Sequence, residues 1–306
     1  MKFEKNIISV RNMDRKTIEH ILLTAKKIEE MPKNKQLEIA KGHTVASLFF
    51  EPSTRTMLSF DTAAKNLGCS VIGFSGTESI SVKKGETLTD TIRMASAYSD
   101  LIVMRHPLEG SSRRAVDVSA VPVINAGDGA NQHPTQTLLD LYTILKSKGT
   151  LDNLTIAIAG DLKYGRTVHS LAYALSFFKN NKLLFVAPKA LGMPEDLINE
   201  LGEKIETREA TITEALENSD ILYMTRIQKE RFLDPQEYEQ LRGTYVLTKK
   251  MLENAKKGLK VMHPLPRVDE ISTDVDSTEN AIYFAQAKNG VPTRMALIAL
   301  LLGVMK

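Results

Sequence analysis

The chain has 306 residues, of which 42% are hydrophobic, and its 40 basic and 37 acidic residues leave a formal net charge of only +3. A chain of this length can bury a full core, and two α/β domains are the natural expectation. The near balance of charge does not favour a nucleic-acid-binding protein, although it permits a local basic cleft.

The cysteine content and the two ends of the chain narrow the class further. A single cysteine, Cys69, excludes an internal disulfide and leaves no cysteine-based metal cluster, which fits a reducing cytoplasm. The N-terminal MKFEKNIISV has charges on both sides of Phe3 and no long apolar core, so we expect no signal peptide. The apolar run 295–305 is too short to span a bilayer and predicts a core helix. We therefore expect a cytoplasmic protein without a metal or other cofactor.

Apolar periodicity predicts two successive alternations of strands and helices. The first has strands at 44–50, 71–74, 101–104 and 121–126, with helices at 14–30, from 53 to 67, at 86–98, at 113–119 and up to 146. The second has strands at 154–159, 183–187, 221–225 and 260–262, with helices at 166–178, 194–203, 212–218 and 248–256. Residues 278–304 read as two helices broken by Asn289-Gly-Val-Pro292. This order predicts two doubly wound parallel sheets.

The polar segment 146–150 gives the expected domain boundary. We expect one domain at 1–146, completed by a C-terminal helix at 291–306, and a second at 147–290. In sheets of this kind, ligands bind beyond the carboxyl ends of the strands. The fold class that we predict is therefore α/β, with an active-site cleft between the two domains.

The stretch Phe50-Glu-Pro-Ser-Thr-Arg-Thr56 joins a predicted buried strand to a predicted helix. Pro52 and Ser53 suit a helix N-terminus, where the backbone N–H groups point outward with the positive end of the helix dipole. Two threonine hydroxyls and the Arg55 guanidinium project into the same space, so the stretch can form an anion site suited to phosphate. An ordinary helix cap with a surface arginine is the alternative.

Six polar clusters follow predicted strands, three in each half of the chain. They are Ser53–Thr56, Arg105-His106, His133–Gln136, Asp161–Arg166, Arg226–Gln228 and His263–Arg267. Their five arginines are fork-shaped donors suited to phosphate and carboxylate, whereas carboxylates for acid–base work are few. This content indicates charge stabilisation around an already reactive substrate.

Seven stretches, six of which contain these clusters, closely resemble the carbamoyltransferase family, and specifically its aspartate carbamoyltransferase catalytic chains. They are FFEPSTRTMLSF, VKKGETLTDTI, VMRHP, NQHPTQTLLDL, AGDLKYGRTVHSL, YMTRIQKERF and VMHPLPRVDEI, and the tail NGVPTRMAL fits as well. The STRT motif is shared by carbamoyltransferases generally, and the later motifs identify the member. The resemblance covers almost the whole chain.

The resemblance implies a residue-by-residue site for carbamoyl phosphate. Its phosphate would be held by Ser53, Thr54, Arg55, Thr56 and Arg105. The carbamoyl oxygen would be faced by Thr56, Arg105 and His133, which stabilise its developing negative charge. The amide group would be oriented by Gln136 and by the carbonyls of Pro264 and Leu265. The reaction implied is the transfer of the carbamoyl group to aspartate in de novo pyrimidine biosynthesis.

The resemblance also implies a site for L-aspartate and a shared active site. The two carboxylates of aspartate would be bound by Arg166, Arg226 and Gln228. A loop of the neighbouring subunit would supply Ser81, with Ser79 as the alternative, and Lys84, which would serve both substrates. A homotrimer is expected, and the motifs leave open whether regulatory chains join it.

The mechanism implied is attack by the neutral amine of aspartate on the carbonyl carbon, followed by loss of phosphate, which can take the proton. Closure of the two domains would strengthen the charge contacts by excluding water. Glu51 and Arg231 are candidates for charged partners that stabilise the closed form, although they can equally be unpaired surface charges. His106 and His263 are expected to be structural.

Three alternatives compete with this interpretation. Residues 160–167 come close to a P-loop, but Arg166 stands where the pattern requires lysine. An ornithine carbamoyltransferase usually has cysteine where this chain has Pro264, and its cationic substrate conflicts with Arg166 and Arg226. A non-catalytic homologue would be expected to lose phosphate-loop residues or Lys84, all of which are present.

Overall fold

The computed structural model describes residues 5–76, 85–129, 131–202, 204–227, 236 and 246–305. The chain divides into two compact units, which we call unit 1 (Met1–Leu138 with Asn289–Lys306) and unit 2 (Leu139–Lys288). Helices α6 (Pro134–Lys148) and α12 (Tyr283–Leu301) carry the chain across the division. Within the described ranges, no helix is long and apolar enough to cross a membrane.

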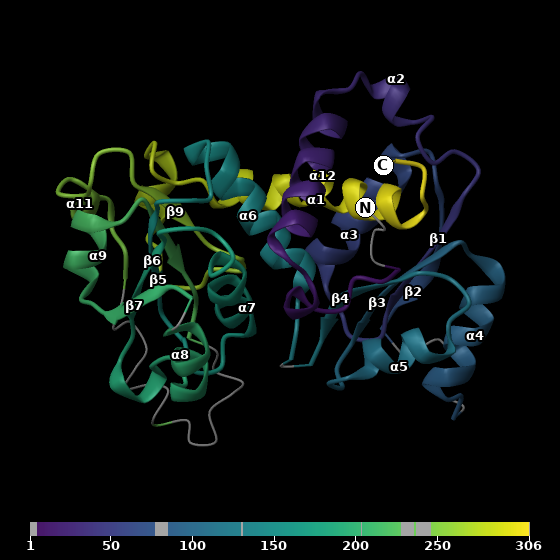
Figure 1. The fold of residues 1–306 in the computed structure, drawn as a ribbon, viewed down its shortest axis with the longest axis horizontal. Coiled ribbons are helices and arrows are strands. Elements are labelled where there is room, and N and C mark those ends of the chain that lie inside the picture. The colour runs from purple at the N-terminus through teal and green to yellow at the C-terminus, as the bar shows by residue number, and fades with distance from the viewer. Residues whose placement is uncertain are drawn as a thin grey trace. The chain divides into compact units, whose positions relative to one another are not determined.

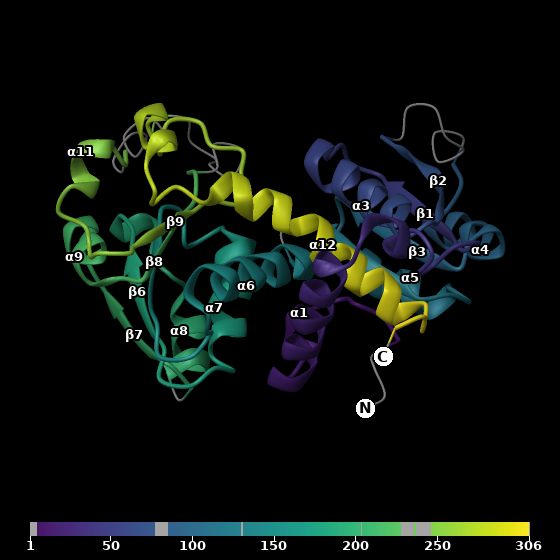
Figure 2. The ribbon, with the colours of Figure 1, turned by 90° about the horizontal axis from the view of Figure 1, so that it is seen from above.

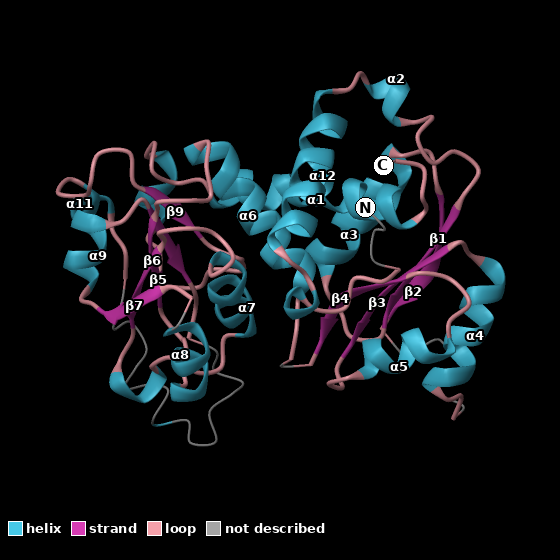
Figure 3. Cartoon of the chain, in the orientation of Figure 1, coloured by secondary structure: helices cyan, strands magenta, loops and turns pink. Residues whose placement is uncertain are grey.

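Unit 1 is built on a four-stranded parallel sheet in the order β2-β1-β3-β4 (Figure 1). Its strands are β1 (Thr44–Phe49), β2 (Ser70–Ser75), β3 (Leu101–His106) and β4 (Val123–Asp128). Helix α3 (Thr54–Asn66) covers one face, and α4 (Leu88–Tyr98) and α5 (Ser111–Val118) cover the other (Figure 3). Buried apolar side chains such as Leu48, Ile92 and Met104 fill the layer between the sheet and α4 and α5.

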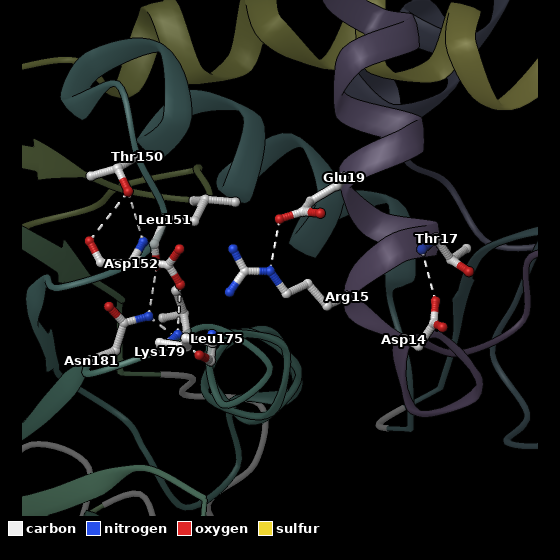
Figure 4. A network of polar contacts seen from close by, with 10 residues as sticks. All are labelled: Asp14, Arg15, Thr17, Glu19, Thr150, Leu151, Asp152, Leu175, Lys179 and Asn181. Atoms are coloured by element: carbon white, nitrogen blue, oxygen red, sulfur yellow. Dashed lines mark hydrogen bonds and ion pairs between the residues drawn. The ribbon is translucent and has the colours of Figure 1, made fainter.

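The N-terminal part of unit 1 holds η1 (Val10–Asn12), α1 (Arg15–Glu30) and α2 (Lys33–Gln36). Helix α1 begins where the sequence predicts, because the Asp14 carboxylate accepts the N–H of Thr17 at 2.8 Å (Figure 4). The pair Arg15–Glu19 follows on its first turns, with Nε and Oε1 2.7 Å apart. Its predicted apolar face is buried, including Ile18, Leu22 and Ile28.

Unit 2 is built on a five-stranded parallel sheet in the order β7-β6-β5-β8-β9. Its strands are β5 (Thr155–Ala159), β6 (Lys182–Val186), β7 (Glu206–Glu209), β8 (Ile221–Met224) and β9 (Lys260–Met262). Its helices are α7 (Arg166–Leu175), α8 (Glu195–Gly202), α9 (Ile212–Asn218) and α11 (Lys249–Leu252), with η3 (Lys189–Leu191) and η5 (Thr273–Ser277). Figure 1 shows α9 and α11 on the opposite face of the sheet from α7 and α8.

The amino end of β5 is held by a buried amide. Asn181 is 3% exposed, and its Oδ1 accepts the N–H of Leu154 at 2.9 Å. Its Nδ2 donates to the carbonyls of Leu151 at 2.8 Å and Leu175 at 3.3 Å (Figure 4). This cluster satisfies backbone groups that no strand or helix pairs, as buried polar groups require.

The two parallel sheets confirm the predicted fold class, and the cleft between the domains stays a prediction. One strand was not predicted, and one expectation about a helix is wrong. Strand β7 is an edge strand of charged, mostly exposed residues, so no apolar pattern signals it. Residues 283–301 form one continuous helix, α12, with Pro292 inside it (Figure 2). Near-complete burial of residues 293–300 outweighs the hydrogen bond that the proline removes.

Candidate active site

Three neighbouring strands of unit 1 end at one edge of the sheet, and each leads into residues predicted for the site. β1, β3 and β4 are consecutive and parallel. Ser53–Thr56 follow β1, Arg105 lies at the end of β3, and His133 directly precedes α6 after the β4 loop. β2 and β3 lie on opposite sides of β1, so the winding reverses between β1 and β3. Such a switch point is where doubly wound sheets bind ligands.

The first turn of α3 lacks a side-chain cap. Ser53 occupies the N-cap position, but its side chain makes no capping hydrogen bond, contrary to what its type suggests. Its carbonyl accepts the N–H of Met57 at 3.1 Å, so the helix starts regularly. Thr54 and exposed Arg55 open the helix, and Thr56 is buried with 9% of its surface exposed. Uncapped N–H groups at the positive end of a 13-residue helix suit an anion.

Two guanidinium groups lie close together at this edge. Partial desolvation of the largely exposed Arg55 side chain lowers its pKa, and the positive charge of Arg105 lowers it further. The Nε of Arg105 donates to Oε1 of Glu51 at 2.6 Å, and the two side chains are 15% and 28% exposed. One carboxylate therefore compensates one of these two guanidinium groups. A bound anion would relieve the repulsion that remains.

The loop after β4 is organised by Asp128, a residue that the sequence reasoning missed. Its buried carboxylate accepts four hydrogen bonds between 2.9 and 3.1 Å, from the N–H groups of Gly110 and Gln132 and the side-chain amides of Asn125 and Asn131. His133 follows directly, is 5% exposed, and accepts the N–H of Gln136 through its carbonyl at 3.0 Å. Asp128 thus fixes the segment that carries His133, and the only sequence signal was an acidic residue between two glycines.

Unit 2 repeats the arrangement of unit 1 at its own sheet edge. β5, β8 and β9 are consecutive, and the winding reverses between β5 and β8. Arg166 opens α7 after β5, Arg226 lies two residues beyond β8, and Pro264-Leu265 follow β9. Helix α7 also starts without a side-chain cap, since Gly165 is its N-cap residue. The structure therefore brings each set of predicted residues to the switch-point edge of its own sheet.

The glycines of Gly160–Arg166 are explained by close backbone packing. Gly160 has a φ of +118°, and a Cβ there would lie 2.2 Å from the carbonyl oxygen of Thr225. A Cβ on Gly165 would lie 2.5 Å from the carbonyl oxygen of Asp161. The Asp161 carboxylate in turn accepts the N–H of Tyr164 at 2.9 Å. The segment is a tight turn that needs glycine for its own geometry, so its glycines by themselves do not indicate a P-loop.

His106 and His263 have the structural roles that we predicted for them. The Nδ1 of His106 accepts the N–H of Leu108 at 3.0 Å, and burial lowers the pKa of His106. The Nδ1 of His263 accepts the N–H of Leu265 at 2.8 Å. Leu265 has a φ of +55°, which a leucine holds only where its surroundings enforce it. Each ring therefore shapes a turn.

Arg267, one of the five strand-end arginines, is committed to a structural ion pair. Its guanidinium contacts the Asp276 carboxylate bidentately, with Nη2 and Oδ2 2.6 Å apart. It also donates to the Tyr283 hydroxyl at 3.1 Å and lies over the Tyr283 and Phe284 rings. The hydrogen bond to Asp276 raises the pKa of Arg267. Arg267 therefore anchors the segment after β9. Substrate binding stays a prediction for the other four strand-end arginines.

Several predicted residues lie outside the described ranges. They are Ser81 with its alternative Ser79, Lys84, Gln228 and Arg231. Among the residues that are described, no group of three or more His, Cys, Asp and Glu could hold a metal ion.

Both units match family models. Residues 5–146 match the carbamoyl-phosphate-binding domain of the aspartate/ornithine carbamoyltransferases, and residues 152–301 match their Asp/Orn-binding domain. The chain belongs to the aspartate/ornithine carbamoyltransferase family. The two models meet between 146 and 152, whereas the division into compact units falls inside α6, after Leu138.

Individual relatives in this family match over nearly the full chain. The aspartate carbamoyltransferase catalytic subunit of Thermococcus gammatolerans is 55% identical over 304 residues, covering 98% of both chains. That of Chromobacterium violaceum is 52% identical, again covering 98% of both. The catalytic subunit of M. jannaschii aspartate transcarbamoylase superposes with a TM-score of 0.92 at 51% identity, covering 98% of both chains. The Trypanosoma cruzi aspartate transcarbamoylase in complex with carbamoyl phosphate and aspartate gives 0.90 at 39% identity, covering 97% of both.

Proposed function

We propose that the chain transfers the carbamoyl group of carbamoyl phosphate to the amine of L-aspartate, giving N-carbamoyl-L-aspartate and phosphate. This reaction would make it the aspartate carbamoyltransferase of de novo pyrimidine biosynthesis. The observation that carries the proposal is the pair of cationic switch-point edges, with Arg55 and Arg105 on unit 1 and Arg166 and Arg226 on unit 2. Two anionic substrates require two such edges, and the relatives reported above are named for this reaction.

Unit 1 would bind carbamoyl phosphate. Its phosphate would contact the uncapped first turn of α3 and the hydroxyls and guanidinium groups of Ser53, Thr54, Arg55, Thr56 and Arg105. Thr56, Arg105 and His133 would donate hydrogen bonds to the carbonyl oxygen as its negative charge develops. Gln136 and the carbonyls of Pro264 and Leu265 would accept from the amide group. The role of these residues is to orient a reactive substrate and stabilise charge.

Unit 2 would bind L-aspartate through Arg166, Arg226 and Gln228. Guanidinium groups pair bidentately with carboxylates, so two arginines suit a dicarboxylic amino acid. Ornithine has a cationic end that would face the same two arginines, which disfavours it as the substrate. The neutral amine would attack the carbonyl carbon, the bond to the phosphate oxygen would break, and the departing phosphate would accept the amine proton.

Loop residues of a neighbouring copy would complete each site. We propose a homotrimer in which Ser81 and Lys84 reach the neighbouring chain's carbamoyl phosphate. The exposed apolar side chains of unit 1 support a subunit interface there, since Leu58, Ile72 and Met94 are 55%, 40% and 46% exposed and Ile72 lies on the edge strand β2. Regulatory chains could bind such a trimer.

The buried Cys69, whose pKa burial raises to about 11, suits a cytoplasmic enzyme.

A substrate comparison tests the reaction directly. The purified chain is given carbamoyl phosphate with either L-aspartate or L-ornithine, and both phosphate release and carbamoylated product are measured. We expect turnover with aspartate and a background rate with ornithine. Product from ornithine, or phosphate release without carbamoylated product, would contradict the proposal.

A hybrid experiment tests the shared site. Lys84→Ala and Arg55→Ala chains should each be inactive alone. When the two are mixed, dissociated and reassembled, random closed trimers should regain roughly a quarter of wild-type activity, because a site is intact when its own chain keeps Arg55 and its neighbour keeps Lys84. Assembled hybrids without activity would show that each chain completes its own site.

A further inference from the structure

A continuous chain of buried hydrogen bonds lies beneath the sheet edge of unit 2. It starts at Asp140 on α6, which is fully buried. Its Oδ2 accepts the hydroxyl of Tyr223 at 2.8 Å, and its Oδ1 accepts Nε2 of Gln286 at 2.6 Å. Burying a carboxylate is costly unless its hydrogen bonds are satisfied, and apolar side chains would fill this place at lower cost. A function in holding other groups would account for it.

One branch of this chain runs from Asp140 to the turn after β9. Gln286 is 1% exposed, and its Oε1 accepts the backbone N–H of His263 at 2.8 Å. Because Nδ1 of His263 accepts the N–H of Leu265, the ring proton lies on Nε2 and is donated to Glu270 at 2.6 Å. Glu270 also accepts the N–H groups of Val268 and Asp269, both at 3.1 Å. The branch therefore holds Pro264-Leu265 from both sides.

The other branch runs to Tyr223 on β8, whose hydroxyl donates to Asp140. Full burial raises the pKa of Tyr223 well above its ordinary value, with the Asp140 charge adding to the effect, so the phenol stays protonated and keeps donating. Asp140 thus connects β8 with the turn after β9 that carries Pro264-Leu265.

We propose that Asp140 and Gln286 are positioning residues for the carbamoyl phosphate of this reaction. Gln286 would fix the Pro264-Leu265 carbonyls at the spacing that recognises the amide NH₂ of carbamoyl phosphate. Asp140 would do the same through Gln286. The proposal rests on the proposed function, because it assigns the amide contacts to that turn.

Acetyl phosphate provides the specific probe, because it has a methyl group where carbamoyl phosphate has NH₂. Discrimination is measured as the inhibition constant of acetyl phosphate divided by the KM of carbamoyl phosphate. We expect Gln286→Met to lower this ratio roughly tenfold, the loss of one good hydrogen bond, while the KM for aspartate changes little. Asp140→Asn should lower the same ratio. Inhibition by inorganic phosphate, which has no amide group, should stay as in the wild type for both.

Asn181→Leu is the matched control, because Asn181 is a buried amide of unit 2 whose hydrogen bonds serve the amino end of β5. It should lower the melting temperature without changing the discrimination ratio. An unchanged ratio in folded Gln286→Met and Asp140→Asn, or an equal fall in Asn181→Leu, would overturn the proposal. If Gln286→Met does not fold, Asp140→Asn, which keeps the shape of the side chain, decides alone. A wild-type chain that makes no carbamoyl aspartate would instead refute the proposed function.

Discussion

The tripeptide His-Pro-Leu ends a strand in each unit, at 106–108 after β3 and at 263–265 after β9. In both, Nδ1 of the histidine accepts the leucine N–H, at 3.0 Å and 2.8 Å. In unit 1 the turn is open to solvent, with Leu108 67% exposed. In unit 2 the histidine is 1% exposed and is held by Gln286 and Glu270. The local sequence makes the same histidine-to-leucine hydrogen bond twice, and only Leu265 has a positive φ, so the surroundings decide the conformation of the turn and how firmly it is held.

This difference matches what each sheet edge would bind. Unit 1 would present two guanidinium groups that repel each other, Arg55 and Arg105, to a phosphate whose charge is nearly the same in every direction. A strong charge interaction of this kind does not require a rigidly held backbone. An amide NH₂ is recognised only at a defined angle and distance, which requires a rigid acceptor. Unit 2 supplies that rigidity with buried hydrogen bonds.

The largest effect is expected at the phosphate edge. Arg55→Ala should lower turnover by about 10³-fold, because it removes a charge-assisted donor from the transition state. The fold should be kept, since the Arg55 side chain is exposed. Steady-state phosphate release measures turnover, and thermal unfolding shows whether the fold is kept. Arg113→Ala, which removes an exposed guanidinium from α5, is the control and should leave turnover unchanged. Wild-type-like activity of Arg55→Ala would rule out the phosphate assignment.

The next effect separates the two edges. Arg166→Ala should raise the KM for aspartate roughly 10- to 100-fold, as expected when a charge-assisted hydrogen bond to a carboxylate is lost. Inhibition by inorganic phosphate should not change, because that anion would bind to unit 1. The KM of Arg166→Lys for aspartate should lie between those of the wild type and Arg166→Ala, because lysine keeps the positive charge but not the forked pair of donors. A parallel loss of phosphate inhibition would mean that the two edges do not divide the substrates as proposed.

The smallest effect concerns Glu270, which accepts hydrogen bonds from His263 and from backbone N–H groups next to the Pro264-Leu265 turn. Burial raises the pKa of Glu270, but the hydrogen bonds from His263 and from the nearby backbone N–H groups outweigh it, so the pKa lies below its ordinary value of 4.5. A lowered pKa means that the ionised group stabilises the fold above pH 4.5 and that this contribution is lost as the pH falls below it.

Glu270→Gln should therefore be less stable than the wild type by about 1 to 3 kcal/mol at neutral pH, with the gap closing in acid. Urea unfolding at several pH values measures the difference. Arg208→Gln, which removes one partner of an exposed ion pair, should show a far smaller gap. A gap of constant size across this range would show that the Glu270 charge does not contribute.

The site could be predicted from the sequence where function depends on local chemistry. Apolar runs followed by Ser53–Thr56, Arg105 and Arg166 located the strand ends, and the structure places them at the switch-point edges. Arg267 shows the limit, because nothing local separates a substrate-binding arginine from one paired with Asp276 nine residues away. Asp128, Asp140 and Gln286 gave no usable signal for the same reason.

The sequence by itself determined the two α/β units, the strands that end in cationic residues and the family motifs, because periodicity and turn chemistry are local. Tertiary structure decided that β7 pairs as a charged edge strand and that α12 continues through Pro292. It also decided that Gln286 meets Asp140, 146 residues away along the chain. Burial and long-range hydrogen bonds depend on which segments meet in the fold, and a residue's neighbours in the sequence do not specify that.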